Sequence, residues 1–331
     1  MSRNVAIMGA TGAVGAEFLS ILEQRQFKMD SLKLLASARS KGKKISFMGE
    51  TLTVQELGHD SFKGIDLVLA SAGGSLSKEF APSAVKAGAV VVDNTSYFRM
   101  VPDIPLVIPE INPDAIRLHR GIIANPNCST IIMALPLFPL HKAFGVKRVS
   151  ICTYQASSGA GAKAMEELKE ETVAILQGKP YTRTVIPHPY AFNLFPHNSK
   201  FNPDTGYCEE EVKMLNETRK IFQDPAFRLT AVCVRVPVLR AHSESLNIEF
   251  VRDVSPEAAY DVLRKAPGID ILEDPSQNRW PMPLDASGQD PVYVGRIRRD
   301  QSQANTLDLW CVGDQLRKGA ALNAVQIAEL L

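Results

Sequence analysis

The chain has 331 residues and a formal net charge of +1, from 37 lysines and arginines against 36 aspartates and glutamates. This length favours two domains, and the balanced charge without a basic tract argues against a nucleic-acid or membrane partner. No apolar run approaches the roughly 20 uncharged residues of a membrane span. Because Met1-Ser2-Arg3-Asn4 runs directly into a strand-like segment, it leaves no room for a signal peptide, and a cytoplasmic protein is expected.

Cysteine and histidine usage agrees with that expectation. The five cysteines are widely spaced and include no C-x-x-C pair, which indicates reduced thiols rather than disulfides. The six histidines show no metal-ligand spacing, so no metal is expected.

A glycine-rich turn follows the first predicted strand. The apolar segment Val5–Met8 leads into Gly9-Ala-Thr-Gly-Ala-Val-Gly15, and apolar residues at helical spacing follow over 18–22. Such a turn lets the backbone approach a pyrophosphate held at a helix N-terminus. The order of strand, glycines and helix therefore predicts a dinucleotide site, with a plain turn as the alternative.

The ends of the next two predicted strands bear on the identity of the cofactor. Residues 31–36 are followed by Arg39 and Ser40, where an NAD site usually has an acid that binds the ribose hydroxyl. A cation and a hydroxyl suit a 2′-phosphate instead, which favours NADP; a solvated basic turn is the alternative. Residues 65–70 open into a segment with Ser71 and Gly73, at the strand edge where cofactors cross such sheets.

Alternating strands and helices continue to residue 127. A helix is expected over 77–87, a strand over 90–93, and a polar loop over 94–99. This alternation is typical of a parallel sheet covered by helices. We therefore expect an α/β fold whose first domain is a Rossmann-type doubly wound parallel sheet.

The segment Asn125-Pro-Asn-Cys-Ser-Thr130 lies at the centre of the chemistry. An apolar run over 121–124 precedes it and another over 131–140 follows, which predicts strand, turn and helix. With Asn127 as the N-cap, Cys128 would lie in the first helical turn, where free N–H groups and the helix dipole favour a thiolate. The same N–H groups could stabilise an oxyanion on a carbonyl that the sulfur attacks. The alternative is an ordinary buried cysteine.

After this helix the pattern changes to that of an α+β domain. Strands are expected over 146–155, 229–237, 246–251, 292–297 and 307–312, and helices over 162–176, 209–223 and 317–331. They predict a mixed, largely antiparallel sheet, and a last helix that returns to the first domain. The aperiodic segment 178–208 is interpreted as a lid or a subunit contact. The expected domains are 1–127 plus 316–331, which binds NADP, and 128–315, for catalysis and dimerisation.

Polar residues at the strand ends form a candidate active site. They are a thiol, an amide, an imidazole and three cations: Cys128, Gln155, His242, Arg99, Lys213 and Arg235. A cysteine with a histidine is a recurring arrangement for acyl chemistry. Beside a nicotinamide cofactor the substrate would be an aldehyde, oxidised through a hemithioacetal to a thioester that phosphate releases. The alternatives are a core histidine, a turn-capping glutamine, and a solvated charge ladder at Glu210, Lys213 and Glu217.

Taken in order, these residues resemble the aspartate-semialdehyde dehydrogenase family over nearly the whole chain. The motifs that carry the resemblance are Gly9–Gly15, Asn94-Thr-Ser-Tyr-Phe-Arg99, Asn125–Thr130, Tyr154-Gln-Ala-Ser-Ser-Gly-Ala-Gly161, Glu210-Glu-Val-Lys-Met214, Arg235-Val-Pro-Val with His242-Ser-Glu244, and Arg317-Lys-Gly-Ala-Ala-Leu-Asn323. The resemblance implies an NADP-dependent, phosphorylating interconversion of L-aspartate 4-semialdehyde and L-4-aspartyl phosphate. It also implies a place in lysine/diaminopimelate, threonine, methionine and isoleucine biosynthesis, and a homodimer or tetramer.

The resemblance further implies residue roles. Cys128 would be the acyl-enzyme nucleophile, His242 the acid/base, and Gln155 an aid in orienting the carbonyl. Phosphate would contact Arg99 and Lys213, while the substrate's carboxylate and amino group would contact Arg235 and Glu210. With Gly9, Ser71 and Gly73, the expected cofactor contacts are Thr11, Gly12, Ala13, Val14, Arg39, Ser40, Ser158, Gly159 and Gln315. The family often has asparagine where Gln315 stands.

Two other functions remain as alternatives at this point. N-acetyl-γ-glutamyl-phosphate reductase uses the same thioester chemistry, but its nucleophile typically lies in a Gly-Cys-Tyr-Pro setting that this chain lacks. A non-catalytic NADP-binding paralogue would tend to lose the nucleophile or the base, whereas Cys128, Gln155 and His242 are all present.

Overall fold

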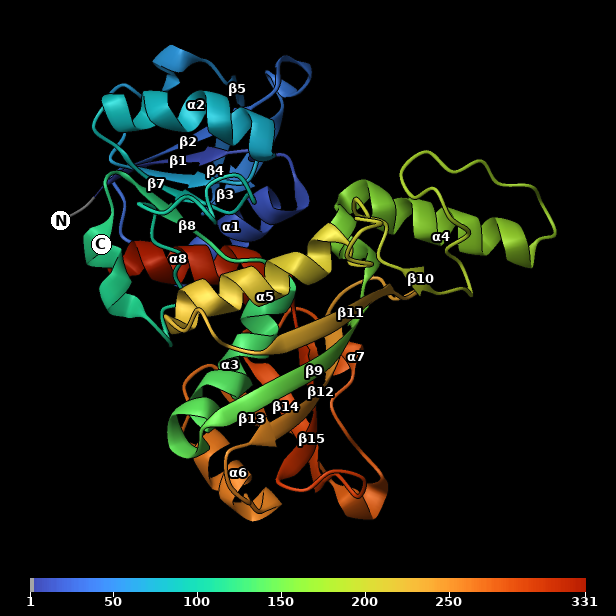
Figure 1. Ribbon diagram of the computed structural model, residues 1–331. Helices are drawn as coiled ribbons and strands as arrows, with labels where there is room; N and C mark the ends of the chain where they lie inside the picture. Colours follow the sequence, from blue (N-terminus) through green and yellow to red (C-terminus); the bar gives the residue numbers. More distant parts are fainter. Residues whose placement is uncertain (1–2) are drawn as a thin grey trace. The chain divides into compact units, whose positions relative to one another are not determined.

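The computed structural model describes residues 3–331 and divides them into two compact units. Unit 1 comprises the described residues up to Asn127 together with Ala320–Leu331, and unit 2 is Cys128–Gly319 (Figure 1). Met1 and Ser2, on which the expectation about the chain start partly rests, lie outside the described residues. No helix within residues 3–331 has the length and apolar character needed to cross a membrane.

Unit 1 is built on a parallel sheet of six strands in the order β5-β2-β1-β6-β7-β8. The strands are β1 (Asn4–Met8), β2 (Ser31–Ala36), β5 (Gln55–Glu56), β6 (Leu67–Ala70), β7 (Val90–Asp93) and β8 (Ile122–Ala124). Every pairing in it is parallel, and the order reverses beside β1 as in doubly wound dinucleotide-binding sheets. The central strands β1, β6 and β7 are apolar and almost wholly buried because helices cover both faces of the sheet, whereas the edge strand β5 is exposed.

Helices α1 (Ala13–Gln24), α2 (Gly74–Lys86) and α8 (Leu322–Glu329) flank this sheet. In Figure 1 α2 lies on one face, and α1 and α8 on the other. A small hairpin of β3 (Lys44–Phe47) and β4 (Glu50–Thr53) was not expected from the sequence. The predicted single helix over 317–331 was wrong in detail, because Arg317–Ala321 forms a π-helical turn before α8 begins.

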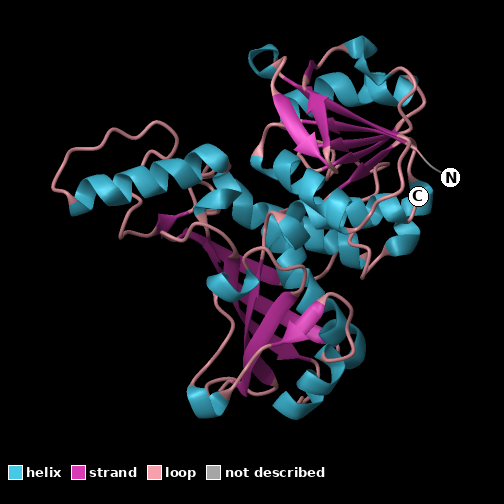
Figure 2. Ribbon diagram, turned by 180° about the vertical axis from the view of Figure 1, so that it is seen from behind, coloured by secondary structure: helices cyan, strands magenta, loops and turns pink. Residues whose placement is uncertain are grey.

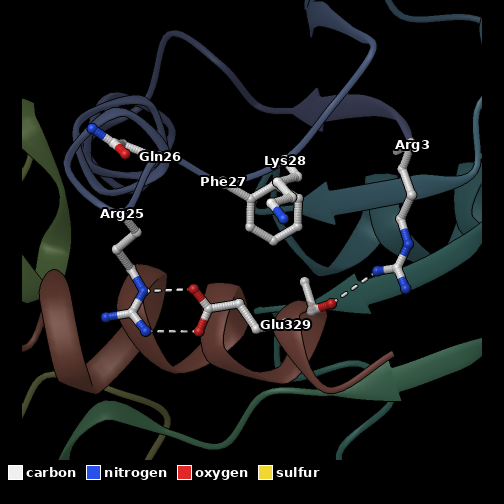
Figure 3. Close-up of a pocket in the computed structure, with 7 residues that line it drawn as sticks. Arg3, Arg25, Gln26, Phe27, Lys28 and Glu329 are labelled. Atoms are coloured by element: carbon white, nitrogen blue, oxygen red, sulfur yellow. Dashed lines mark hydrogen bonds and ion pairs between the residues drawn. The ribbon is translucent and has the colours of Figure 1, made fainter. Parts of the chain in front are cut away.

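An ion pair connects α8 to the C-terminal end of α1. Arg25, which caps α1, binds Glu329 with two contacts of 2.7 Å, and Arg3 donates to the carbonyl of Ala328 at 2.9 Å (Figure 3). These side chains line a surface pocket of about 360 Å³. Since α1 has 12 residues, the pocket lies about 18 Å along the helix from the glycine turn and is separate from it.

Unit 2 contains a seven-stranded mixed sheet in the order β10-β11-β9-β12-β15-β14-β13. Its strands are β9 (Val146–Gln155), β10 (Phe195–Pro196), β11 (Leu229–Arg235), β12 (His242–Phe250), β13 (Ile269–Ile271), β14 (Val292–Arg299) and β15 (Thr306–Gly313). Only β11 with β9 and β13 with β14 pair in parallel, so the sheet is largely antiparallel. The predicted fold class, a Rossmann-type sheet with a second α+β domain, is confirmed.

The helices of unit 2 are α3 (Cys128–Phe144), α4 (Ala162–Leu176), α5 (Glu209–Phe222), α6 (Pro256–Leu263) and α7 (Pro283–Ala286). Helix α3 packs against α5 and α6 and against the sheet, and it is buried from Ser129 to Leu137. The strand expected to start at residue 246 begins at His242 instead, so the His-Ser-Glu motif is part of β12.

Two carboxylates on α4 hold the long segment that follows it. Glu167 accepts the backbone N–H groups of residues 184–186, and Glu171 accepts those of Tyr190 and Ala191 at 3.0 and 3.1 Å. Burial alone would raise the pKa of Glu167, but these donors lower it overall. Figure 2 shows the segment running beside α4. It is therefore an ordered loop, although only β10 has regular structure.

Candidate active site

The turn between β8 and α3 presents the candidate nucleophile. Strand β8 ends at Ala124 and α3 begins at Cys128, as the Asn-Pro-Asn sequence predicts. The apolar residues that follow are buried, which fixes the helix start in unit 2. Cys128 is the first residue of α3, so its sulfur lies at the N-terminal end of a helix. The residue is only half-buried, which leaves the sulfur within reach of solvent or a ligand.

His242 faces this sulfur from the first residue of β12. The distance from Cys128 Sγ to His242 Nε2 is 3.6 Å, and His242 Nδ1 accepts the backbone N–H of Ala156 at 3.0 Å. Since Nδ1 is the acceptor, the neutral ring carries its hydrogen on Nε2, which points at the sulfur. Burial, with a smaller effect of the Arg235 cation, lowers the pKa of His242 to about 3. The ring is therefore neutral at physiological pH and donates to the sulfur.

Two glycines make room around this pair. A Cβ on Gly159 would lie 3.2 Å from the His242 ring and 3.2 Å from Arg235 Nη1. A Cβ on Gly319 would lie 3.0 Å from the Cβ of Cys128. Side chains at either position would crowd the thiol or the imidazole, so both glycines serve the site by their small size.

Gln155 ends β9 beside the nucleophile helix. Its Nε2 donates to Ser129 Oγ at 2.5 Å and to Glu210 Oε1 at 3.2 Å, while its Oε1 is buried without a hydrogen-bond partner. The turn-capping alternative is therefore wrong, because the amide bonds to two other elements. Ser129 was missed as a site residue, although it follows Cys128 directly in the recognised motif.

Charged groups gather at the other side of Gln155. Glu210 and Lys213 on α5 form an ion pair of 3.3 Å, with Glu210 only 6 % exposed. Arg235, at the end of β11, is also 6 % exposed and donates from Nη1 to the carbonyl of Ala156 at 3.2 Å. The solvated charge ladder is excluded as an interpretation, since Glu210 and Glu217 are both buried. The arrangement places buried groups of both charges beside Gln155.

The glycine turn of unit 1 has the geometry of a phosphate cradle. Gly9 has a φ of +94°, and a Cβ there would lie 2.4 Å from the carbonyl oxygen of Ser71. Helix α1 starts after Gly12 without a side-chain cap, so its first N–H groups remain available for an anion. Gly73, with a φ of +99°, precedes α2 in the same way at the end of β6.

The predicted ribose-phosphate residues lie beside this turn. Thr11 Oγ1 lies 3.3 Å from Ser40 Oγ, and Arg39 next to it is exposed. In unit 2, Ser158 bonds to Gln315 through their side chains, and Gln315 Oε1 accepts the N–H of Ala241 at 2.9 Å. The expected cofactor contacts thus fall into one group in each unit.

Arg99 belongs to unit 1 and binds the ends of two strands. It is 8 % exposed and donates from Nε to the carbonyl of Asn125 and from Nη2 to that of Asn94, each at 2.9 Å. Asn125 itself donates to Asn94 Oδ1 at 2.6 Å and accepts from Asn323 Nδ2 at 2.7 Å. This amide network, missed as part of the site, fixes the turn that leads to the nucleophile.

Three of the other cysteines are poorly suited to nucleophilic chemistry. All five cysteines are free, and burial raises the pKa of Cys152, Cys233 and Cys311. Among residues 3–331 no group of three or more histidine, cysteine, aspartate or glutamate side chains could hold a metal ion.

Comparison with known proteins gives the family. Residues 4–119 match the model of the semialdehyde dehydrogenase NAD binding domain, and residues 137–318 match that of the semialdehyde dehydrogenase dimerisation domain. A protein from Synechocystis named aspartate-semialdehyde dehydrogenase is 59% identical over 99% of this chain and 96% of its own length. One of the same name from Aquifex aeolicus is 52% identical over 100% of this chain and 98% of its own.

Solved structures agree with the sequence comparison. Aspartate semialdehyde dehydrogenase II from Vibrio cholerae, complexed with ASA, superposes with a TM-score of 0.97 at 46% identity, covering 100% of this chain and 98% of that one. The Candida albicans enzyme with NADP gives a TM-score of 0.77 at 26% identity, covering 100% and 98%. The nucleotide-binding fold, the cysteine–histidine pair and these similarities lead to one conclusion: the chain belongs to the aspartate-semialdehyde dehydrogenase family of oxidoreductases.

Proposed function

We propose that this chain catalyses the NADP-dependent, phosphorylating interconversion of L-aspartate 4-semialdehyde and L-4-aspartyl phosphate through a thioester on Cys128. The observation that carries the proposal is the 3.6 Å approach of Cys128 Sγ to His242 Nε2 at the start of α3. The family assignment supports the substrate, and the intact pair argues against a non-catalytic paralogue.

The chemistry follows from the hydrogen-bond directions around the sulfur. A thiolate accepts from His242 Nε2–H and adds to the aldehyde carbon, which converts the carbonyl oxygen into an alkoxide. The N–H groups at the start of α3 and the imidazole N–H stabilise this negative charge. NADP, when bound, supplies the hydride acceptor that turns the adduct into a thioester. In this tautomer Nε2 already carries a hydrogen, so the thiol proton leaves to solvent and Nε2 acts as the hydrogen-bond donor to the thiolate and then to the alkoxide. The acid/base role of His242 remains our proposal, with Nε2–H as the acid.

The amino-acid end of the substrate would be held by opposite charges. Within residues 3–331 Arg235 donates through Nε and Nη1, and the remaining edge of its guanidinium suits the planar α-carboxylate. Glu210, although paired with Lys213, would accept from the α-amino group. Gln155 would orient the carbonyl, since it lies between Ser129 and Glu210.

Phosphate is the proposed second nucleophile. Its oxygen attacks the thioester carbon and expels the Cys128 thiolate, which leaves an acyl phosphate. Lys213 and Arg99 are the cations proposed to bind it. Lys213 is about 30 % exposed in its side chain, and Arg99 is oriented by the backbone carbonyls of Asn94 and Asn125.

NADP is proposed over NAD as the cofactor. Arg39 is exposed beside Ser40, and the two suit a 2′-phosphate where an acid would exclude it. The pyrophosphate would lie on Gly9, Thr11, Gly12, Ala13 and Val14, because the start of α1 lacks a side-chain cap. The other proposed contacts are Ser71, Gly73, Ser158, Gly159 and Gln315.

The domain roles are proposed on the same basis. Residues 1–127 with 316–331 would bind NADP, and 128–315 would carry catalysis and dimerisation; the compact units divide four residues later, at Ala320. We also propose a homodimer, or a tetramer built from it, in the cytoplasm. The match to a dimerisation-domain model supports the dimer.

The proposal is tested by the substrate and phosphate dependence of NADPH formation. The purified protein should reduce NADP with L-aspartate 4-semialdehyde only when phosphate or a phosphate analogue is present. N-acetylglutamate semialdehyde should be a far poorer substrate. Equal rates with both aldehydes, or sustained turnover without phosphate, would contradict the proposed function.

A further inference from the structure

The segment His197-Asn198-Ser199 lies beside the amino-acid end of the proposed site, although its sequence shows no motif. It follows β10, whose Phe195 pairs with Arg235 of β11, and the N–H of His197 continues this pairing to the carbonyl of Cys233 at 2.8 Å. The segment therefore leaves the sheet at the level of Cys233, two residues before Arg235 on β11.

Side chains of this segment contact both residues proposed to bind the amino-acid group. Asn198 Oδ1 accepts from Arg235 Nε at 3.5 Å, which is long for a hydrogen bond. Ser199 Oγ accepts the backbone N–H of Glu210 at 3.2 Å, at the first turn of α5. This short segment thus contacts the guanidinium of Arg235 through Asn198, and the first turn of α5, which carries Glu210, through Ser199.

The segment is itself held in place. His197 Nδ1 accepts the N–H of Ser199 at 3.2 Å and lies 3.1 Å from its hydroxyl. Burial lowers the pKa of His197 to about 4, with Arg235, Glu210 and Lys213 as the charges that act on it. The imidazole is therefore neutral and acts as an acceptor for Ser199. The carboxylates of α4 anchor the preceding part of the loop.

We propose that His197-Asn198-Ser199 is a positioning element that sets selectivity for the amino-acid group of the substrate, with Asn198 acting through Arg235 and Ser199 through Glu210. This inference rests on the proposed function. Asn198 leaves Nη2 and the outer edge of the guanidinium for the α-carboxylate. Ser199 sets the direction in which α5 presents Glu210 to the α-amino group.

The two halves of the inference are separated by aldehydes that lack one group each. Succinate semialdehyde keeps the carboxylate and lacks the amino group, whereas 3-aminopropanal keeps the amino group and lacks the carboxylate. Asn198→Ala should raise KM for aspartate semialdehyde and succinate semialdehyde about 3- to 10-fold, the range of one ordinary hydrogen bond. It should leave KM for 3-aminopropanal unchanged.

Ser199→Ala should give the opposite pattern. KM should rise for aspartate semialdehyde and 3-aminopropanal by about the same factor and stay constant for succinate semialdehyde. In both variants kcat should change little, because neither residue contacts Cys128 or His242. Asn193→Ala is the matched control: Asn193 is exposed in the same loop and bonds to the carbonyl of Pro189 at 2.8 Å.

The outcomes are decisive in both directions. If a variant changes KM for all three aldehydes by the same factor, or for none of them, the segment has no selective role and the inference is overturned. If the unmodified protein does not act on aspartate semialdehyde, the proposed function fails instead. Asn198→Asp provides a second measurement, since an acid beside Arg235 would compete with the substrate carboxylate and raise KM more than alanine does.

Discussion

The buried amide of Asn323 gives the sharpest prediction about how the site is supported. Its Nδ2 donates to the carbonyl of Val107 at 3.0 Å and to Asn125 Oδ1 at 2.7 Å, and Asn323 is 0 % exposed. Replacing it with leucine keeps the branched shape and the number of side-chain heavy atoms but removes the donor. Two buried acceptors then lose this bond, and each such loss costs about 1–3 kcal/mol.

We therefore expect Asn323→Leu to lower the free energy of unfolding of unit 1 by about 2–6 kcal/mol. Urea unfolding followed by circular dichroism, with hydrogen exchange on β8, would measure it. Activity should fall as well, because Asn125 begins the turn that ends at Cys128. Gln326→Ala is the control: it lies on the same helix and binds Glu110 at 3.1 Å in a partly exposed position.

The reasoning is refuted if Asn323→Leu lowers the free energy of unfolding by no more than Gln326→Ala does. A loss of stability without any change in the rate would also count against it, since the network would then support the sheet but not the nucleophile turn.

Three further predictions concern the cofactor, the substrate and pH. Arg39→Ala should raise KM for NADP about 10- to 150-fold, from about 1.5–3 kcal/mol of charged hydrogen bond, and leave KM for NAD unchanged; equal losses would remove the 2′-phosphate assignment. Arg235→Lys keeps the charge but not the fork, so KM for the semialdehyde should rise about tenfold or more, and an unchanged KM would move the carboxylate site elsewhere. Burial raises the pKa of Glu244 well above 4.5, so the folded state holds this proton to higher pH than the unfolded state. Its stabilising effect is complete below pH 4.5 and is lost towards alkaline pH; Tm should fall less steeply with pH in Glu244→Gln, and parallel curves would contradict this.

Local patterns account for what the sequence predicted well. The glycine turn, the Asn-Pro-Asn turn and the helix over 162–176 are specified within a few residues by backbone chemistry, and the structure has them where expected. The start of β12 at His242 was not predicted, because a buried strand that begins with His, Ser and Glu does not show the apolar alternation of an ordinary strand.

Contacts between distant segments could not be read in the same way. Asn198 and Ser199 are polar loop residues, and only the pairing of β10 with β11 brings them to Arg235 and α5. Likewise the role of Asn323 depends on a helix nearly 200 residues from Asn125 in sequence. Side-chain partners at such separations follow from the topology, which single-residue preferences do not encode.

Turnover in the absence of phosphate tests the central claim, a thioester on Cys128, most directly. Mixing the protein with NADP and aspartate semialdehyde, with phosphate withheld, should release about one equivalent of NADPH per site and then stall until phosphate is added. His242→Ala should slow this burst by roughly 10²–10⁴. Mass spectrometry should find the acyl group on the peptide that contains Cys128. A burst that survives Cys128→Ala, or an adduct on Cys152, Cys208, Cys233 or Cys311, would contradict the mechanism.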